Sequence, residues 1–377
     1  MKLQRKNRLR ATALGALAVS GALVLTACGS DDNSGSTGGN GGKTSAASNI
    51  KCDDAKGQLS ASGSSAQKNA MDLWAKNYMT GCSGVEINYK QSSSGEGIVA
   101  FNQGTVGFAG SDSALKPEEV AESKKICKGG QGISLPMVGG PIAIGFHLEG
   151  VDSLTLDAPT LAKIFDGKIK KWNNPAIAKL NSGAKLPDKA IQAFHRSEDS
   201  GTTQNLGKYL GAAAPSDWKY EAEKKWPAPG GQAASGSAGV AAQVKQVDGS
   251  IGYFELSYAT SQSISTVDID TGGAAPVKAT SENASKAIAA AKIKGTGKDL
   301  ALDLDYTTKA EGAYPIVLVT YEIVCDKGNK AETLPTVKSF LNYTAGDEGQ
   351  KLLIDAGYAP IPTEINAKVR ETIASLS

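Results

Sequence analysis

The stretch LPMVGGPIAIGFHL, from Leu135 to Leu148, is a run of apolar and β-branched residues interrupted by Gly139-Gly140-Pro141. Such a run predicts a long strand that bends at its glycines. A second run of this kind, IVLVTYEIVC, occupies residues 316–325. Two long strands, one before the middle of the chain and one near its end, predict two crossings between two lobes. The first lobe is then discontinuous in sequence.

The segment before the first crossing, residues 58–112, alternates between strand and helix patterns. This alternation predicts a parallel sheet with crossover helices, in which ligands gather at the carboxyl ends of the strands. Ser65, Ser94 and Asp112 each follow the end of a strand, so we expect them on one rim of the sheet. Ser64 and Ser65 are good N-caps, which predicts that the first helix begins at about Ala66.

A third cluster of polar residues is RSEDSGTT, from Arg196 to Thr203. It follows a strand pattern at 191–194 and precedes apolar residues at helical spacing, so a helix is expected to begin near Ser200. Arg196 can offer a planar, two-pronged donor. Glu198 or Asp199 is expected to orient it from behind, and the sequence does not choose between them.

These loops have the chemistry of a site for a small oxyanion. Three helix N-termini are expected, at Ser65-Ala66, Ser94-Gly95 and Ser200-Gly201-Thr202, and each offers free N–H groups and a positive dipole end. A carboxylate such as Asp112 repels an anion unless the ligand carries a proton, so it favours phosphate over sulfate. Taken singly, each motif is also typical of a helix cap, a turn, a loop residue or a surface ion pair.

The N-terminus has the pattern of an export signal. Residues 1–28 comprise a basic start, an apolar run and Leu25-Thr26-Ala27-Cys28, which is similar to a bacterial lipobox with Cys28 as the lipidated residue. An ordinary signal peptide that contains a cysteine is the alternative. Residues 29–50 are rich in glycine and serine and predict a flexible linker. We therefore expect a membrane anchor on Cys28, on the extracytoplasmic face of a bacterial cell membrane.

Composition excludes some partners. The 40 basic and 38 acidic residues nearly balance, so a nucleic-acid partner is not expected. Four cysteines remain after Cys28, and an even number in an exported chain favours two disulfides over free thiols. We favour the pairings Cys52–Cys82 and Cys127–Cys325. Cys52 and Cys82 each precede a strand, and the two strands are expected to be parallel neighbours that start side by side. A zinc site is not expected, because the chain has no CxxC and only two histidines.

On these motifs the chain resembles the phosphate-binding proteins of phosphate-specific ABC transporters, which are substrate-binding lipoproteins. The resemblance runs from about residue 58 to 365 and is strongest in RSEDSGTT, LAKIFDGKIKKWNNPAIAKLN (161–181) and IGYFELSYA (251–259). It implies an α/β, two-lobed type II periplasmic binding protein fold with two hinge-crossing strands. Lobe I would comprise 51–141 and 317–377, and lobe II 142–316.

The resemblance also implies the phosphate ligands, which are Ser65, Ala66, Ser94, Asp112, Arg196, Ser200, Gly201 and Thr202. Three positions depart from the usual family pattern. Ser65-Ala66-Gln67 stands where the family often has Thr-Phe-Pro, Glu96 stands where it often has glycine, and Glu198-Asp199 stands where it often has Asp-Gly.

The implied function is capture of inorganic phosphate and delivery to the permease subunits of an ABC importer, by a monomer without cofactor or metal. A secreted phosphatase or serine hydrolase is the alternative, with Ser200 as nucleophile and His195 or Asp112 as base. His195 and Arg196 are neighbours on an expected strand, so their side chains should point to opposite faces, which argues against the histidine. A binder of another tetrahedral oxyanion is a further alternative.

Overall fold

The computed structural model describes residues 50–377. The expected signal segment, its Cys28 and the linker up to residue 49 lie outside the described residues. None of the helices in 50–377 has the length and apolar character needed to cross a membrane.

One mixed sheet of nine strands organises the fold, in the order β2-β1-β3-β13-β4-β8-β6-β7, with β9 pairing on β4. Neighbours are parallel within β2-β1-β3 and within β8-β6-β7, whereas β13 and β4 are antiparallel to both of their neighbours. The strands are β1 Gly57–Gly63, β2 Val85–Gln91, β3 Phe108–Ser111, β4 Gly132–His147, β6 Gln192–Arg196, β7 Gln232–Ala234, β8 Ser250–Glu255, β9 Ser265–Thr266 and β13 Val317–Cys325.

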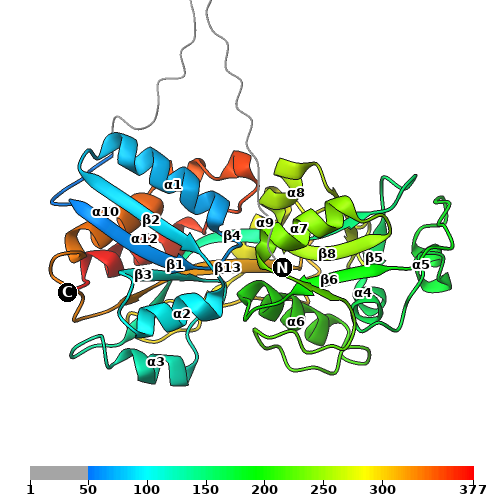
Figure 1. Ribbon diagram of the computed structural model, residues 1–377, viewed down its shortest axis with the longest axis horizontal. Coiled ribbons are helices and arrows are strands. Elements are labelled where there is room, and N and C mark those ends of the chain that lie inside the picture. Colours follow the sequence, from blue (N-terminus) through cyan, green and yellow to red (C-terminus); the bar gives the residue numbers. More distant parts are fainter. Residues whose placement is uncertain (1–49) are drawn as a thin grey trace, which may run out of the picture. The chain divides into compact units, whose positions relative to one another are not determined.

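Helices cover the sheet, and two small ribbons flank it. In Figure 1, α1, α10 and α12 lie beside β1 to β3 at the left of the folded part, and α4 to α8 lie beside β6 and β8 at the right. The helices are α1 Lys68–Gly81, α2 Ser94–Asn102, α3 Pro117–Ser123, α4 Ala158–Phe165, α5 Pro175–Leu180, α6 Gly201–Ala213, α7 Gly236–Gln246, α8 Leu256–Gln262, α9 Ser281–Ala289, α10 Leu334–Thr344, α11 Asp347–Lys351, α12 Thr363–Ala374 and the 3₁₀ helix Ile354–Ala356. The ribbons pair β5 Thr155–Asp157 with β10 Asp268–Asp270 and β11 Lys292–Ile293 with β12 Leu302–Asp303.

The two long strands predicted from sequence are β4 and β13, and both run through the middle of the sheet (Figure 1). Up to Pro141, β4 pairs with β13, and from Ile142 onward it pairs with β8. The change of partner therefore falls at the Gly-Gly-Pro interruption. Every residue of β13 is buried, and so is every residue of β4 up to Phe146, which explains why both read as continuous apolar runs.

The first helix starts later than the sequence predicted. α1 begins at Lys68, not at Ala66, and Gln67 is its N-cap residue. The reason is local, because the Ser64 hydroxyl accepts a hydrogen bond from the Ala66 N–H at 3.0 Å and stabilises a turn instead of a helix. α2 and α6 begin as expected, with Ser93 and Ser200 as their caps.

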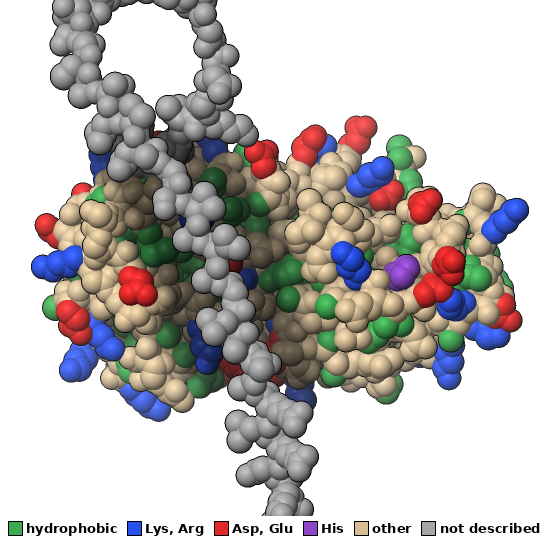
Figure 2. Space-filling model, turned by 45° about the horizontal axis from the view of Figure 1, so that its top comes forward, with side chains coloured by type: hydrophobic (Ala, Val, Ile, Leu, Met, Phe, Trp, Pro, Cys, Tyr) green, Lys and Arg blue, Asp and Glu red, His purple; other side chains and the backbone are tan. Residues whose placement is uncertain are grey.

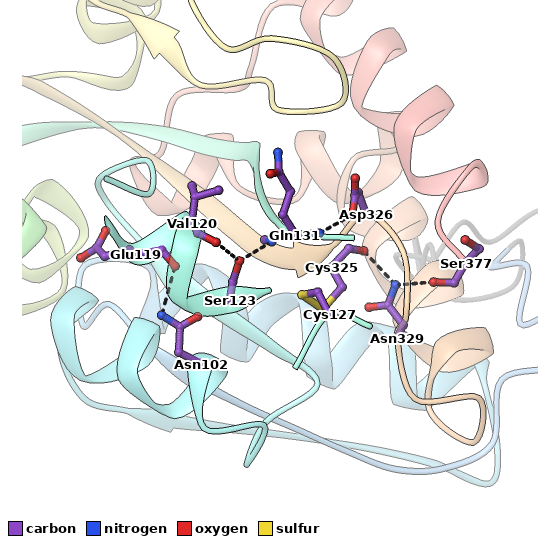
Figure 3. The surroundings of a disulfide bond; sticks show 11 residues. Asn102, Glu119, Val120, Ser123, Cys127, Gln131, Cys325, Asp326, Asn329 and Ser377 are labelled. Carbon is purple, nitrogen blue, oxygen red and sulfur yellow. Dashed lines mark hydrogen bonds between the residues drawn. A yellow bond between two sulfur atoms is a disulfide. The ribbon is translucent and has the colours of Figure 1, made fainter. Parts of the chain in front are cut away.

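Both favoured disulfides are present. Cys52 is bonded to Cys82 and Cys127 to Cys325, across sequence separations of 30 and 198 residues. Figure 3 shows the second bond beside the Ser123 hydroxyl, which donates to the Val120 carbonyl and accepts from the backbone N–H of Gly132. The Cys127–Cys325 bond therefore ties the segment after α3 to the end of β13.

Candidate functional site

Three of the predicted loops meet at the carboxyl ends of their strands. The Ser94 hydroxyl, at the start of α2, accepts a hydrogen bond from the Asp112 N–H at 3.1 Å. The Thr202 hydroxyl, in the first turn of α6, donates to Asp112 Oδ2 at 3.0 Å. β3 and β6 thus place Asp112 and the start of α6 against each other. The contact between Ser94 and Asp112 agrees with the prediction that these two residues share a rim of the sheet.

Gly201 is what allows this close approach. A Cβ on Gly201 would lie 2.7 Å from Ser94 Oγ and 2.8 Å from Asp112 Cβ, closer than side-chain atoms pack. The junction is fixed further by Asn205, whose amide donates to the Asp112 carbonyl at 2.7 Å and to the Gly201 carbonyl at 2.9 Å. The glycine in RSEDSGTT therefore has a packing role in addition to its free N–H.

Arg196 lies at the end of β6, and its side chain is almost fully buried. Its Nε donates to Glu198 Oε1 at 2.6 Å, and Nη2 donates to the same oxygen. Burial alone would raise the pKa of Glu198, but the Arg196 guanidinium holds that pKa below its usual value. Glu198, and not the Asp199 side chain, is therefore the acid that orients Arg196. The Asp199 backbone carbonyl instead accepts from the Gly95 N–H at 3.0 Å.

The remaining nitrogen of Arg196 points toward hydroxyl groups. Nη1 lies 3.4 Å from both Thr202 Oγ1 and Ser237 Oγ. The Ser237 N–H donates to Ser65 Oγ at 3.0 Å, and the Tyr258 hydroxyl donates to the Ser65 carbonyl at 2.7 Å. The first loop, Arg196 and the N-terminus of α7 are thereby joined in one donor-rich cluster.

Asp112 is the acidic member of the cluster. Its Oδ1 accepts from the Thr320 hydroxyl at 2.9 Å, and its Oδ2 accepts from Thr202. Burial raises the pKa of Asp112, while the hydroxyls of Ser64, Thr320 and Thr202, and then Arg196, act in the opposite direction. A carboxyl group in this setting can accept a proton from a bound ligand.

Three members of the cluster were missed by the sequence interpretation. Thr320 is the one serine or threonine in the apolar run 316–325, and that exception could have been read as a side chain facing the site. Ser237 follows a glycine at the start of a helix, which is the same pattern as the predicted loops. Ser64 was read only as a cap, although its hydroxyl acts on Asp112.

Two residues of the hydrolase alternative, Ser200 and His195, have structural partners. The Ser200 hydroxyl accepts from the Thr203 N–H at 3.3 Å, which is a helix cap. The His195 ring stacks on Trp226 with centroids 4.9 Å apart and planes at 6°. The Arg196 side chain is instead buried in the cluster, so these two neighbouring side chains have different surroundings.

Other features bear on ligand class. Within residues 50–377, no group of three or more His, Cys, Asp or Glu side chains is arranged to hold a metal ion. Figure 2 shows acidic and basic side chains interspersed over the face in view, as the balanced composition indicated.

Comparisons with known proteins place the chain in a family. Residues 51–348 match the family model of the PBP superfamily domain. Phosphate-binding protein PstS 3 of Mycobacterium tuberculosis is 43% identical over 380 residues, with 100% of both chains covered. PstS 2 of the same organism is 40% identical, with 98% of this chain and 99% of the relative covered.

Solved structures share the fold. A periplasmic phosphate-binding protein, PfluDING, bound with phosphate, superposes with a TM-score of 0.68 at 21% identity, covering 84% of this chain and 93% of that one. The phosphate-binding protein of Stenotrophomonas maltophilia gives a TM-score of 0.66 at 20% identity, covering 84% and 93%. The fold, with its two long central strands, and the full-length similarity agree, and the chain belongs to the PBP superfamily and, within it, to the PstS phosphate-binding proteins.

Proposed function

We propose that this protein captures inorganic phosphate between two lobes and delivers it to the permease of an ABC importer. The observation that carries the proposal is the buried cluster in which Arg196, three loop hydroxyls and one proton acceptor, Asp112, converge. The relatives are named phosphate-binding proteins, and solved structures of the same fold hold phosphate, which supports this choice of ligand.

The proposed ligands divide into donors and one acceptor. The Arg196 guanidinium, the hydroxyl groups and the backbone N–H groups at the loop starts would bind the phosphate oxygens, and Asp112 would accept the P–OH proton. Sulfate has no proton at neutral pH, so its oxygens would face the carboxylate unpaired. The proposed donors are Ser65, Ala66, Ser94, Arg196, Ser200, Gly201 and Thr202.

The two lobes are proposed to comprise 51–141 with 317–377, and 142–316. The change of β4 from β13 to β8 between Pro141 and Ile142 supports a hinge at this point. Contacts from one proposed lobe to the other include ion pairs between Lys116 and Glu223 and between Lys224 and Glu119. Closure around the ligand would be a hinge motion of these lobes.

The protein is further proposed to act as a monomer on the extracytoplasmic face of the cell membrane, anchored by a lipid on Cys28. The sequence LTAC before a glycine- and serine-rich linker supports the anchor. The two disulfides support an oxidising compartment outside the cytoplasm. Binding rather than hydrolysis is proposed, because Ser200 serves as a helix cap.

Calorimetric titration of the protein with phosphate, sulfate and arsenate tests the proposal. We expect tight binding of phosphate, far weaker binding of sulfate, and no release of phosphate from p-nitrophenyl phosphate. Sulfate binding as tight as phosphate binding would point to a general oxyanion binder. Turnover of the ester that is lost in Ser200→Ala would establish the hydrolase instead.

A further inference from the structure

Glu322, in the middle of β13, is a buried acid outside the proposed ligand set. Its exposed fraction is 0%, and neither carboxyl oxygen has a hydrogen-bond partner. A buried carboxylate without a partner is strongly unfavourable, whereas a neutral carboxylic acid is far less so. The neighbouring side chains therefore have to account for how a buried acid is tolerated at this position.

The polar side chain beside Glu322 is Gln67, at the N-cap of α1. Gly110 is paired with Glu322 across β3 and β13, and a Cβ on Gly110 would lie 1.8 Å from Gln67 Nε2. Gln67 Oε1 is also buried without a hydrogen-bond partner. Gln67 Oε1 and the carboxyl group of Glu322 are both satisfied if Glu322 carries a proton and donates it to this oxygen. One proton thus accounts for two unpaired buried groups.

The nitrogen of the Gln67 amide already has a hydrogen-bond partner. Its Nε2 donates to the Tyr89 hydroxyl at 3.0 Å, and that hydroxyl donates to the Ser64 carbonyl at 2.9 Å. Turning the amide over would make Tyr89 donate to Gln67 and would remove the donor from Ser64. The observed hydrogen bonds run from Gln67 through Tyr89 to Ser64, and so they end on the first loop of the site.

Gly110 leaves the room that this chain needs. It pairs with Glu322 across β3 and β13, and a Cβ on it would lie 1.8 Å from Gln67 Nε2 and 2.6 Å from the Tyr89 hydroxyl. Any side chain at 110 would therefore displace the two middle members of the chain. The backbone of β3 is shaped around these side chains.

The electrostatic surroundings favour the neutral acid. Burial raises the pKa of Glu322 to about 8, Gln67 acts in the opposite direction, and the charge of Asp112 at the end of β3 raises the pKa further. Tyr89 on β2 is the other titratable neighbour, and burial holds its pKa well above its usual value. On the β4 side, Leu135 lies opposite Glu322 and is apolar. The helices packed on β13 carry the charged side chains Glu96 of α2, Lys208 of α6, and Glu282 and Lys286 of α9.

We propose that Glu322 is a positioning residue for phosphate binding: as a neutral acid it donates to Gln67 and, through Gln67 and Tyr89, holds the Ser64–Ala66 loop in place. Loss of its proton breaks this chain and adds a negative charge behind the site. The inference rests on the proposed function, because phosphate is taken as the ligand.

The direction of the pH dependence follows. Phosphate binding favours the protonated form of Glu322, so affinity is unaffected while the group is neutral and falls as the pH rises above the pKa of the free protein. One proton must then be taken up on binding, which weakens binding by up to about tenfold for each pH unit. Phosphate and Asp112 titrate as well, so the effect has to be read as a ratio between variants.

The test is calorimetric titration of the protein with phosphate between pH 6.5 and 9.5, for the wild type, Glu322→Gln and Glu322→Leu. The glutamine variant keeps a donor toward Gln67 Oε1 at every pH. We expect it to bind within about threefold of wild type at pH 6.5 and at least about tenfold tighter than wild type at pH 9.5. The leucine variant has no donor and is expected to bind at least about tenfold more weakly at pH 6.5.

Glu255 provides a matched control, because burial also raises its pKa to about 8 but its Oε2 accepts from the Ser257 N–H. Glu255→Gln should keep the pH dependence of the wild type. A wild-type to Glu322→Gln affinity ratio that stays constant with pH would overturn the proposal even if Glu322→Leu does not fold. Loss of the pH dependence in Glu255→Gln alone would also overturn it.

Infrared spectroscopy separates this inference from the choice of ligand. The carbonyl stretch of a protonated carboxylic acid should be present at pH 6.5 in the wild type and reduced in Glu322→Gln. A wild type that shows this band but binds no phosphate at pH 6.5 would refute the proposed function and leave the protonated Glu322 established. Identical spectra for the two proteins would refute the protonated acid itself.

Discussion

At the scale of single residues, the site separates a fixed donor from a proton acceptor. Glu198 binds two nitrogens of Arg196 and leaves Nη1 directed at the hydroxyls of Thr202 and Ser237. Asp112 receives hydroxyl donors on both carboxyl oxygens. The orientation of each group is set by a neighbour, so conservative replacements should have measurable effects.

Arg196→Lys should weaken phosphate binding by tenfold to a hundredfold. A lysine has a single point charge and cannot bind Glu198 and phosphate with separate nitrogens at once. Loss of a charge-assisted hydrogen bond in a buried site costs about 1.5–3 kcal/mol. Calorimetric titration gives the affinity, and Lys225→Ala, an exposed cation outside the cluster, is the control. A twofold or smaller change in the arginine variant would show that Arg196 does not contact phosphate.

Asp112→Asn should reduce discrimination against sulfate more than it reduces phosphate affinity. The amide can donate to an unprotonated oxygen, so the penalty of roughly 1–3 kcal/mol for two opposed acceptors disappears. Competition binding of phosphate and sulfate at several pH values measures the ratio. The same phosphate-to-sulfate ratio in wild type and variant would exclude Asp112 as the group that senses the ligand proton.

At the scale of elements, patterns that depend on near neighbours were readable from the sequence. The hydroxyl-rich starts of α2 and α6 and the apolar runs of β4 and β13 were predicted where the structure has them. The start of α1 was wrong because the Ser64 hydroxyl competes for a backbone N–H. Thr320 and Ser237 were missed because their roles depend on which strands and helices are adjacent, and a local pattern does not contain that information.

The Cys127–Cys325 bond should stabilise the fold more than Cys52–Cys82. In the chain-entropy model, closing loops of 198 and 30 residues lowers the free energy of folding by about 5 and about 4 kcal/mol, respectively. The two double Cys→Ala variants, compared by denaturant unfolding, test this order. An equal or larger loss in the Cys52/Cys82 variant would show that strain or residual structure outweighs loop length.

At the scale of the whole molecule, the proposed task needs a binding unit held near the membrane. Cys28→Ala should release the protein into the medium or leave its signal segment uncleaved, because no thiol remains for lipid attachment. Membrane fractionation of cells without the transporter measures this, with Cys52→Ala as the control. A variant that stays with the membrane fraction at the wild-type level after its signal segment has been removed would contradict lipid anchoring at Cys28.

The position of β13 between β3 and β4 determines the order in which parts of the fold can form during export. An exported chain emerges from its N-terminus, so β3 and Cys127 appear long before β13 and Cys325, their partners. The Cys52–Cys82 pair is complete as soon as α1 has emerged. During secretion the unpaired edge of β3 and one reactive thiol must wait for about half the chain. During this interval the chain depends most on chaperones that protect the edge of β3 and on oxidases that form the disulfide. The sheet is completed only when β13, its last strand, has emerged.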